Sequence, residues 1–158
     1  MRLGTEYRSI PDQPAHKERG RLAVLLLDDN THFVDYVTAV GIAAGTDIVG
    51  PADSRRLPHH VARMHPELQF GAAIVALMHP GHDTGVILPR LAAVGSIDHL
   101  VMLVNHPSPS AMAAAEKFAR SLAAWRVEAW EKPVHAGFLK SRLGTMAGQH
   151  IADTTPDK

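Results

Sequence analysis

The stretch Leu-Ala-Val-Leu-Leu-Leu-Asp-Asp-Asn, residues 22–30, decides the fold class of this chain. Six consecutive apolar residues are typical of a β-strand that is covered on both faces, as in a parallel sheet flanked by helices. The two aspartates that follow place carboxylates where this strand ends. We therefore expect a parallel α/β sheet whose first strand spans residues 22–27 and carries polar chemistry at its carboxyl end.

The rest of the chain repeats this alternation of apolar strand and amphipathic helix. Each predicted strand is short and is followed by a segment with hydrophobic residues at helical spacing. Five successive units of strand and helix predict one parallel α/β domain. The four further strands are predicted at residues 46–49, 72–77, 100–104 and 126–130.

The domain is expected to occupy residues 21–148. Residues 1–20 contain prolines, glycines and charges without a helix or strand period, which is typical of a flexible N-terminal arm. Residues 149–158 are predicted to form a polar C-terminal tail. No DNA-binding or catalytic output segment follows residue 147, so we expect a stand-alone module.

Composition excludes several classes of function. Sixteen basic side chains balance sixteen acidic ones, which is not the charge of a nucleic-acid-binding protein. Cysteine is absent, which excludes disulfides, thiol nucleophiles and cysteine-ligated metals. No apolar run approaches the roughly 20 residues of a membrane-spanning helix, and the N-terminus lacks the apolar region of a secretory signal. We expect a cytoplasmic protein with no nucleic-acid or membrane partner.

Polar residues also follow the later strands. Residues 78–83 follow the third strand, Asn105 the fourth and Lys132 the fifth. Because the carboxyl ends of parallel strands meet at one edge, we expect these residues to gather near Asp28 and Asp29. Paired carboxylates suit Mg²⁺, and a lysine can neutralise a phosphoryl oxygen. The alternative is that Asp28 caps the following helix and Asp29 favours its positive N-terminus.

Three short motifs stand after strands one, three and five: Asp28-Asp29, Met78-x-Pro80-Gly81-x-Asp83 and Lys132-Pro133. In these motifs and in the order of its elements, the chain resembles the receiver domain of bacterial two-component response regulators over about residues 21–147. The resemblance implies a flavodoxin-like (βα)5 fold, a doubly wound parallel sheet with strand order 2-1-3-4-5. It also implies Mg²⁺-dependent phosphoryl transfer from a histidine kinase to an aspartate that ends strand three.

The residues that receive and report the phosphoryl group in this family are replaced here. The acceptor position falls on Ala76, which has no nucleophilic side chain. The hydroxyl residue expected at the end of strand four is Val104. The aromatic switch position of strand five falls on Ala129, or on Trp130 if the register shifts by one residue. We therefore predict a pseudo-receiver with no catalytic residue at the usual position.

A residual acidic pocket is still expected at this edge. Asp28, Asp29 and Lys132 occupy positions that match the family, and with one carboxylate missing we expect the lysine to pair with the aspartates. No resident cofactor is expected, and Mg²⁺ is predicted to bind weakly, in the millimolar range or not at all.

Histidine is the most over-represented residue type, with eleven histidines against five lysines. His79, His82 and His106 are predicted to lie at the same strand ends as the aspartates. Imidazole and carboxylate together suit Zn²⁺, and histidine also titrates near neutral pH. The alternative is that these are solvated loop histidines, since their spacing is not a known ligand signature.

The function that we predict is a non-enzymatic signalling module that acts through protein–protein contact. Its partner would be a histidine kinase, a response regulator or another signalling protein. One alternative is a phosphorelay receiver that uses Asp83, Asp28 or Asp29 as a substitute acceptor. Another is a metal- or pH-sensing module built on the histidine-rich edge.

The resemblance to receivers, which commonly dimerise or meet an effector through this face, implies a homodimer through the surface formed by the last two helices and the strand between them, within residues 109–146. Met112 and Glu116 lie on the first of these helices, and Trp125 and Trp130 flank the strand. Indole rings often anchor protein contacts. The alternative is that both tryptophans fill the core.

Overall fold

Five parallel strands form one sheet in the computed structural model, which describes residues 21–28, 30–50, 65–76, 84–105 and 109–154. The spatial order of the strands is β2-β1-β3-β4-β5, and every neighbouring pair is parallel. The predicted fold class, a doubly wound flavodoxin-like sheet of this strand order, is confirmed. In chain order the strands are β1 (Leu22–Leu27), β2 (Asp47–Val49), β3 (Gln69–Ala76), β4 (His99–Val104) and β5 (Arg126–Glu131).

The apolar runs become central strands because helices cover them on both faces. Every residue of β1 and β4 is buried, and β3 is buried from Phe70 to Ala76. β5 is an edge strand that carries three charged residues, and only Trp130 in it is fully buried. Charges on an edge strand oppose its pairing with the strand of another molecule.

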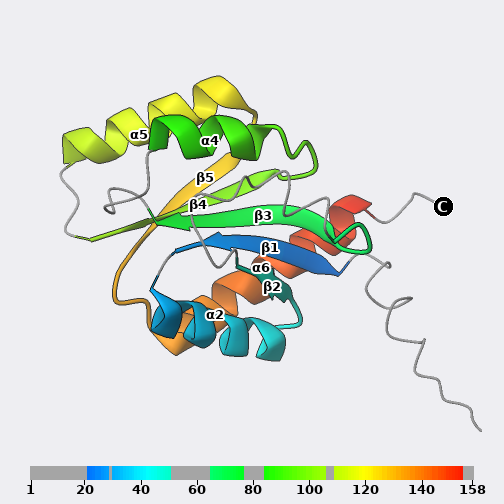
Figure 1. Ribbon diagram of the computed structural model, residues 1–158. Coiled ribbons are helices and arrows are strands. Elements are labelled where there is room, and N and C mark those ends of the chain that lie inside the picture. The colour runs from blue at the N-terminus through cyan, green and yellow to red at the C-terminus, as the bar shows by residue number, and fades with distance from the viewer. Residues whose placement is uncertain (1–20, 29, 51–64, 77–83, 106–108, 155–158) are drawn as a thin grey trace, which may run out of the picture.

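Four described helices cover the two faces of the sheet (Figure 1). α2 (Thr31–Ala43) and α6 (Ala136–Thr154) lie on one face, and α4 (Thr84–Ala92) and α5 (Pro109–Leu122) on the other. Each face has its own hydrophobic core, the α2–α6 core holding Leu139 and Trp130 and the α4–α5 core holding Leu88 and Trp125. None of these helices has both the length and the hydrophobicity that a bilayer crossing requires.

α2 ends at a glycine turn. Gly45 follows the C-cap residue Ala44 and has a φ of 83°, in the left-handed region that favours glycine. The chain can therefore reverse directly into β2, which lies beside β1 at the edge of the sheet.

Two element boundaries differ from the predicted ones by more than one residue. β3 begins at Gln69, three residues earlier than predicted. α6 continues to Thr154, so residues 149–154 are helical rather than part of the predicted tail. The added turn places His150 against Gly71 of β3, where a Cβ atom would come within 2.8 Å of the His150 Nδ1 atom. The predicted arm at residues 1–20 lies outside the described residues.

Candidate functional site

The carboxyl ends of four strands meet at one edge of the sheet, as the sequence predicts for the site. The register of β1 and β3 places Asp28 level with Ala76, and that of β4 and β5 places Val104 opposite Glu131. The backbone N–H of Lys132 donates to the carbonyl oxygen of Val104 at 2.9 Å. The residues that would act in a receiver are therefore neighbours in space.

Asp28 and Lys132 form a buried ion pair at this edge. The Lys132 Nζ atom lies 2.6 Å from Asp28 Oδ2, and the exposed fractions of the two side chains are 18% and 0%, respectively. The other carboxylate oxygen, Asp28 Oδ1, accepts a hydrogen bond from the backbone N–H of Asn30 at 2.9 Å. Both oxygens of the carboxylate are thus engaged by groups of the protein itself.

The first turn of α2 holds Lys132 from the other side. The Lys132 Nζ atom lies 4.3 Å from the centroid of the Phe33 ring, a cation–π contact. The N-cap of α2 is Asn30, whose Oδ1 atom accepts from the Phe33 N–H at 3.1 Å. This corrects the alternative in which Asp28 caps the helix: Asp28 lies two residues too early and binds the N–H of the cap residue.

Apolar side chains occupy the positions where a receiver needs reactive ones. Ala76 and Val104 are each 4% exposed. On β5, Ala129 is exposed, whereas Trp130 is buried and packs edge-on against Phe138 with ring centroids 5.6 Å apart. Neither Ala76 nor Val104 offers a side-chain oxygen to a phosphoryl group.

The described residues do not fit an Mg²⁺ centre. Mg²⁺ prefers six oxygen ligands, including free carboxylates, but both oxygens of Asp28 are engaged and Ala76 supplies none. No group of three or more histidine or acidic side chains placed to hold a metal occurs in the described part of the chain. The other predicted site residues lie outside it: the carboxylate Asp29, the candidate metal ligands His79, His82 and His106, and the substitute acceptor Asp83.

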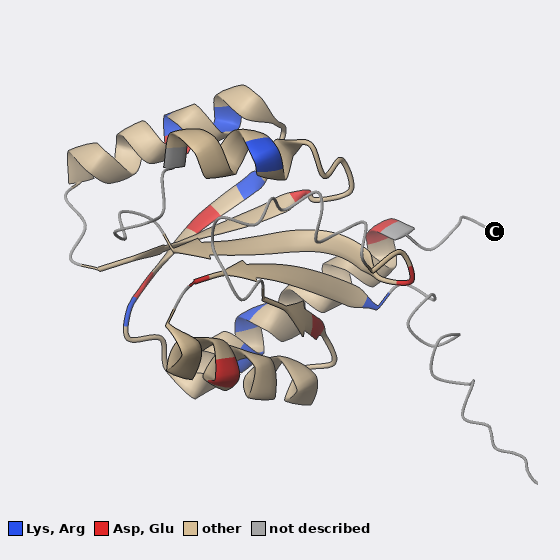
Figure 2. Ribbon diagram, in the orientation of Figure 1, with Lys and Arg blue, Asp and Glu red and all other residues tan. Residues whose placement is uncertain are grey.

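A second charged cluster lies on β5 and was missed by the sequence analysis. Glu128 accepts hydrogen bonds from His99 Nε2 at 2.5 Å, from Trp130 Nε1 at 2.7 Å and from Arg142 Nη2 at 2.7 Å. Burial raises the pKa of Glu128, but the bonds from these three side chains outweigh it and hold the pKa well below its usual range. Figure 2 shows charged residues along β5. The alternation of polar and apolar residues in this strand is the sequence signal that could have located the cluster.

Both tryptophans lie in the core and not on the predicted interface. Trp125 is 5% exposed in the α4–α5 core, and Trp130 is 3% exposed in the α2–α6 core. Their large apolar area fills the space under the helices, and Glu128 satisfies the indole N–H of Trp130. The prediction that they anchor a partner is therefore wrong. Met112 and Glu116 are half-buried on α5.

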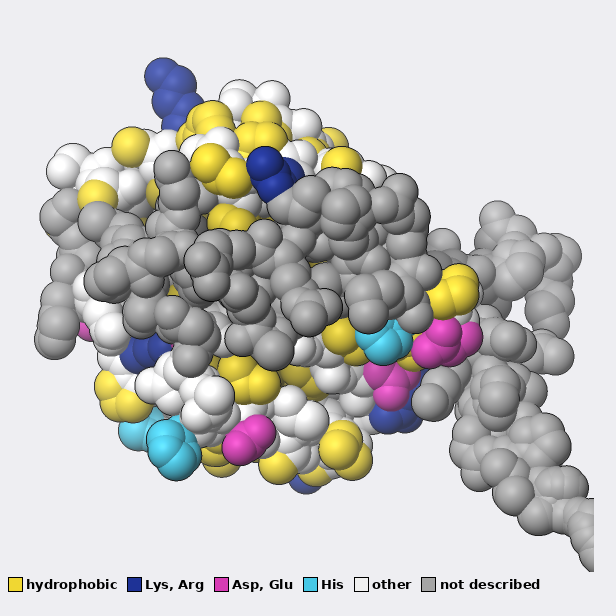
Figure 3. All heavy atoms as spheres, in the orientation of Figure 1, with side chains coloured by type: hydrophobic (Ala, Val, Ile, Leu, Met, Phe, Trp, Pro, Cys, Tyr) yellow, Lys and Arg dark blue, Asp and Glu magenta, His cyan; other side chains and the backbone are white. Residues whose placement is uncertain are grey.

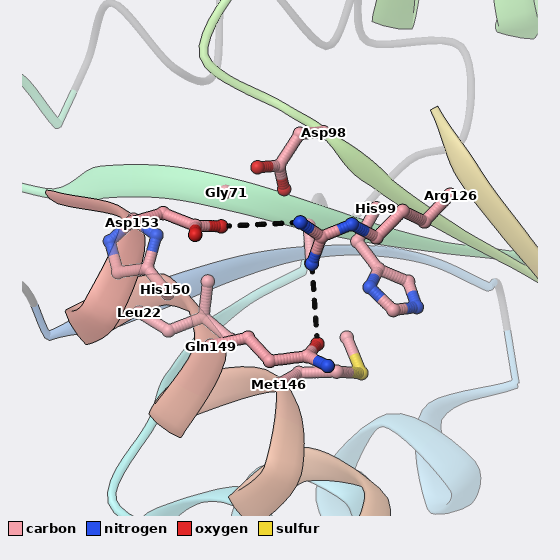
Figure 4. A pocket seen from close by; sticks show the side chains of 10 residues that line it. Leu22, Gly71, Asp98, His99, Arg126, Met146, Gln149, His150 and Asp153 are labelled. Carbon is pink, nitrogen blue, oxygen red and sulfur yellow. Dashed lines mark hydrogen bonds and ion pairs between the residues drawn. The ribbon is translucent and has the colours of Figure 1, made fainter. Parts of the chain in front are cut away.

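The amino-terminal ends of the strands, opposite the carboxyl edge, line a small pocket, shown in Figure 4. Arg126 of β5 donates to Gln149 and to Asp153 of α6 at 3.4 Å each. Burial lowers the pKa of His150 in this pocket, and the carboxylates of Asp98 and Asp153 oppose that shift. The cavity volume of ≈ 10 Å³ admits about one water molecule. This edge joins the end of α6 to the sheet and has no room for a ligand.

The fold and the arrangement of strand ends define a doubly wound α/β domain of the receiver type. No family model matches the sequence, and the search of curated proteins gives no match either. Among solved structures, the receiver domain protein (CheY-like) of Methanospirillum hungatei JF-1 has a TM-score of 0.62 at 13% identity, over 84% of this chain and 98% of that one.

Two further structures show the same similarity. The chemotaxis protein CheY4 of Vibrio cholerae has a TM-score of 0.60 at 18% identity, over 79% of this chain and 98% of that one. A response regulator from Colwellia psychrerythraea has a TM-score of 0.59 at 16% identity, over 82% and 98%. At these identities the similarity establishes the receiver fold of the chain.

Replacing Lys132 by Met should lower the free energy of unfolding by about 3–5 kcal/mol, because the Asp28 carboxylate would remain buried without its partner. The double variant Asp28→Asn/Lys132→Met removes both charges and should recover most of that loss. Urea denaturation at neutral pH measures both. Equal stability of the wild-type protein and the Lys132→Met variant would contradict a buried ion pair.

The Glu128 cluster predicts an acid-sensitive part of the stability. A carboxylate whose folded pKa lies below its unfolded value, here 4.5, stabilises the fold above that pH and loses this contribution as the pH falls through the folded pKa. Glu128→Gln should therefore destabilise the protein at pH 7, and the difference from wild type should shrink below about pH 4.5. Denaturant unfolding from pH 7 to pH 3 measures it. Glu131→Gln, at an exposed position of the same strand, controls for the loss of one charge. A difference that stays constant with pH would refute the assignment.

Proposed function

We propose that this chain is a pseudo-receiver, a signalling module that acts through protein–protein contact and not by phosphorylation at the usual position. The observation that carries the proposal is at the end of β3. Ala76, with a buried methyl side chain, stands level with Asp28, whose carboxylate is already neutralised by Lys132. A nucleophile is missing, and the lysine that would meet a phosphoryl oxygen already donates one hydrogen bond to Asp28.

The positions that would report a phosphoryl group also support this proposal. Val104 is buried and lacks a hydroxyl, so it makes no hydrogen bond to an incoming oxygen. Trp130 is fixed between the Phe138 ring and the Glu128 carboxylate. A side chain held on both sides is poorly suited to change rotamer as a switch. We infer that the surface for the partner is constitutively formed.

Acetyl phosphate with Mg²⁺ should leave the intact mass of the protein unchanged, because position 76 carries no nucleophile. A receiver domain with its acceptor aspartate, treated in parallel, controls for the reagent. Ala76→Asp alone should not restore phosphorylation, since Val104 still lacks the hydroxyl. An alkali-labile phosphoryl group on the wild-type chain would contradict the proposal and support the phosphorelay alternative. Asp28→Asn, Asp29→Asn and Asp83→Asn variants would then locate it.

The surface that we propose for the partner lies on α5, β5 and α6, and the partner that we propose is a second copy of this chain. Exposed Ala113 and Ala114 allow a close approach to α5. Phe138 is 47% exposed at the start of α6, beside the edge strand. Figure 3 shows hydrophobic atoms and few charges over the upper layer, where α4 and α5 lie. With both tryptophans buried, Phe138 is the apolar anchor of this surface.

Phe138→Asp and Lys117→Glu should weaken the dimer without unfolding the chain, because both side chains are exposed. Light scattering over a range of protein concentrations measures the mass. Ile42→Asp, at an apolar position of α2 that is 65% exposed, is the matched control and should leave the dimer intact. A wild-type protein that stays monomeric at millimolar concentration would refute the homodimer.

A further inference from the structure

A pocket with a volume of ≈ 630 Å³ opens at the carboxyl edge, between the start of α2 and the segment that joins β5 to α6. This volume lies in the range of about 300–1,000 Å³ in which proteins bind small organic molecules. The lining combines aromatic rings with polar side chains, among them Asn30, His32, Phe33, Tyr36 and Lys132. No step of the proposed signalling function uses this pocket.

The two walls of the pocket are fixed to each other by contacts far apart in the chain. The Tyr36 hydroxyl of α2 donates to the carbonyl oxygen of Val134 at 2.8 Å, across 98 positions of sequence. The Lys132 ammonium lies against the Phe33 ring at the same place. Figure 1 shows the segment between β5 and α6 running beside the start of α2. The pocket is therefore preformed, which lowers the entropy cost of binding.

The charges at the pocket favour an anion. Lys132 is the charged residue of the described lining, and its partner Asp28 has no exposed side-chain surface. An ammonium has three donors, and Asp28 Oδ2 takes one of those on Lys132. α2 is thirteen residues long and has no acidic side chain in its first turn, so none of its own first-turn residues offsets the positive end of its dipole.

The remaining walls favour an apolar ligand body. The Phe33 and Tyr36 rings have centroids 6.2 Å apart, tilted by 48°, and Pro133 and Val134 complete the apolar lining. We propose that the pocket binds a small organic carboxylate with an aromatic or branched apolar body. Its carboxylate would accept hydrogen bonds from Lys132, and its body would pack against the two rings.

Calorimetric titration with phenylacetate tests the proposal directly. Phenylacetamide removes the charge, acetate removes the ring, and inorganic phosphate supplies charge without an apolar body. We expect saturable binding of phenylacetate that is at least about tenfold tighter than that of each of these three probes. The measurement needs no phosphodonor and no protein partner, so its failure leaves the proposed function untouched.

Asn30→Asp provides a variant that is expected to fold, because aspartate caps a helix about as well as asparagine. It places a negative charge at the pocket and should weaken phenylacetate binding by about tenfold or more. Thr145→Glu, which adds the same charge on the exposed face of α6, is the matched control and should bind like wild type. Absence of saturable binding for both phenylacetate and isovalerate would overturn the proposal. Binding of phenylacetamide or phosphate as tight as that of phenylacetate, or equal effects of the two variants, would also overturn it.

Discussion

The ion pair between Asp28 and Lys132 joins the end of the first strand to the residue after the last strand, across 104 positions of sequence. A carboxylate with no exposed surface costs several kcal/mol to bury unless an opposite charge lies against it. The two strand ends must therefore meet for the domain to fold with both charges satisfied. Because Lys132 also contacts Phe33, the same cation sets the position of the first turn of α2. The carboxyl edge is arranged around this pair.

The alanine at position 76 and the pairing of Lys132 with Asp28 belong to the same arrangement. Among the described residues, Asp28 is the carboxylate that pairs with Lys132, with the Nζ and Oδ2 atoms 2.6 Å apart, and the neighbouring Ala76 supplies none. A receiver that transfers phosphate needs an acceptor, a hydroxyl and a cation that are all available to one incoming group. Here positions 76 and 104 carry buried hydrocarbon side chains, and the lysine already donates to Asp28, an arrangement that agrees with the proposed pseudo-receiver. These features together support the proposal that the carboxyl edge keeps one fixed arrangement and that the module acts by binding a partner.

The fold could be predicted from the sequence because continuous apolar runs such as that of residues 22–27 identify buried parallel strands. The strand order came from the resemblance to receivers, since periodicity contains no information on which strands are neighbours. The last turn of α6 was missed because its residues show no apolar stripe: Ile151 is 48% exposed, and the turn is joined to the sheet through Arg126 and Asp153. Such contacts join distant segments, and local propensity does not report them.

The site was predictable only where strand ends specify it. The pairing of Asp28 with Lys132 follows from parallel strands that end at one edge, whereas the Glu128 cluster needs residues from β4, β5 and α6 to meet. The tryptophans illustrate the same limit, because an indole is equally suited to a core and to an interface. Only the tertiary packing separates the two: α6 buries Trp130 beside Glu128, and the α4–α5 core encloses Trp125.

The Glu128 cluster and the ion pair act on the same strand. β5 has a hydrogen-bonded neighbour on one side only, so the backbone ladder fixes it less firmly than the central strands. Glu128 accepts hydrogen bonds from His99 on β4 and from Arg142 on α6, which fixes the middle of β5 by side chains instead. Lys132 directly follows this strand, and its own N–H continues the ladder to Val104. The position of the lysine at the carboxyl edge therefore depends on a carboxylate four residues earlier, and the two charged groups support the edge together.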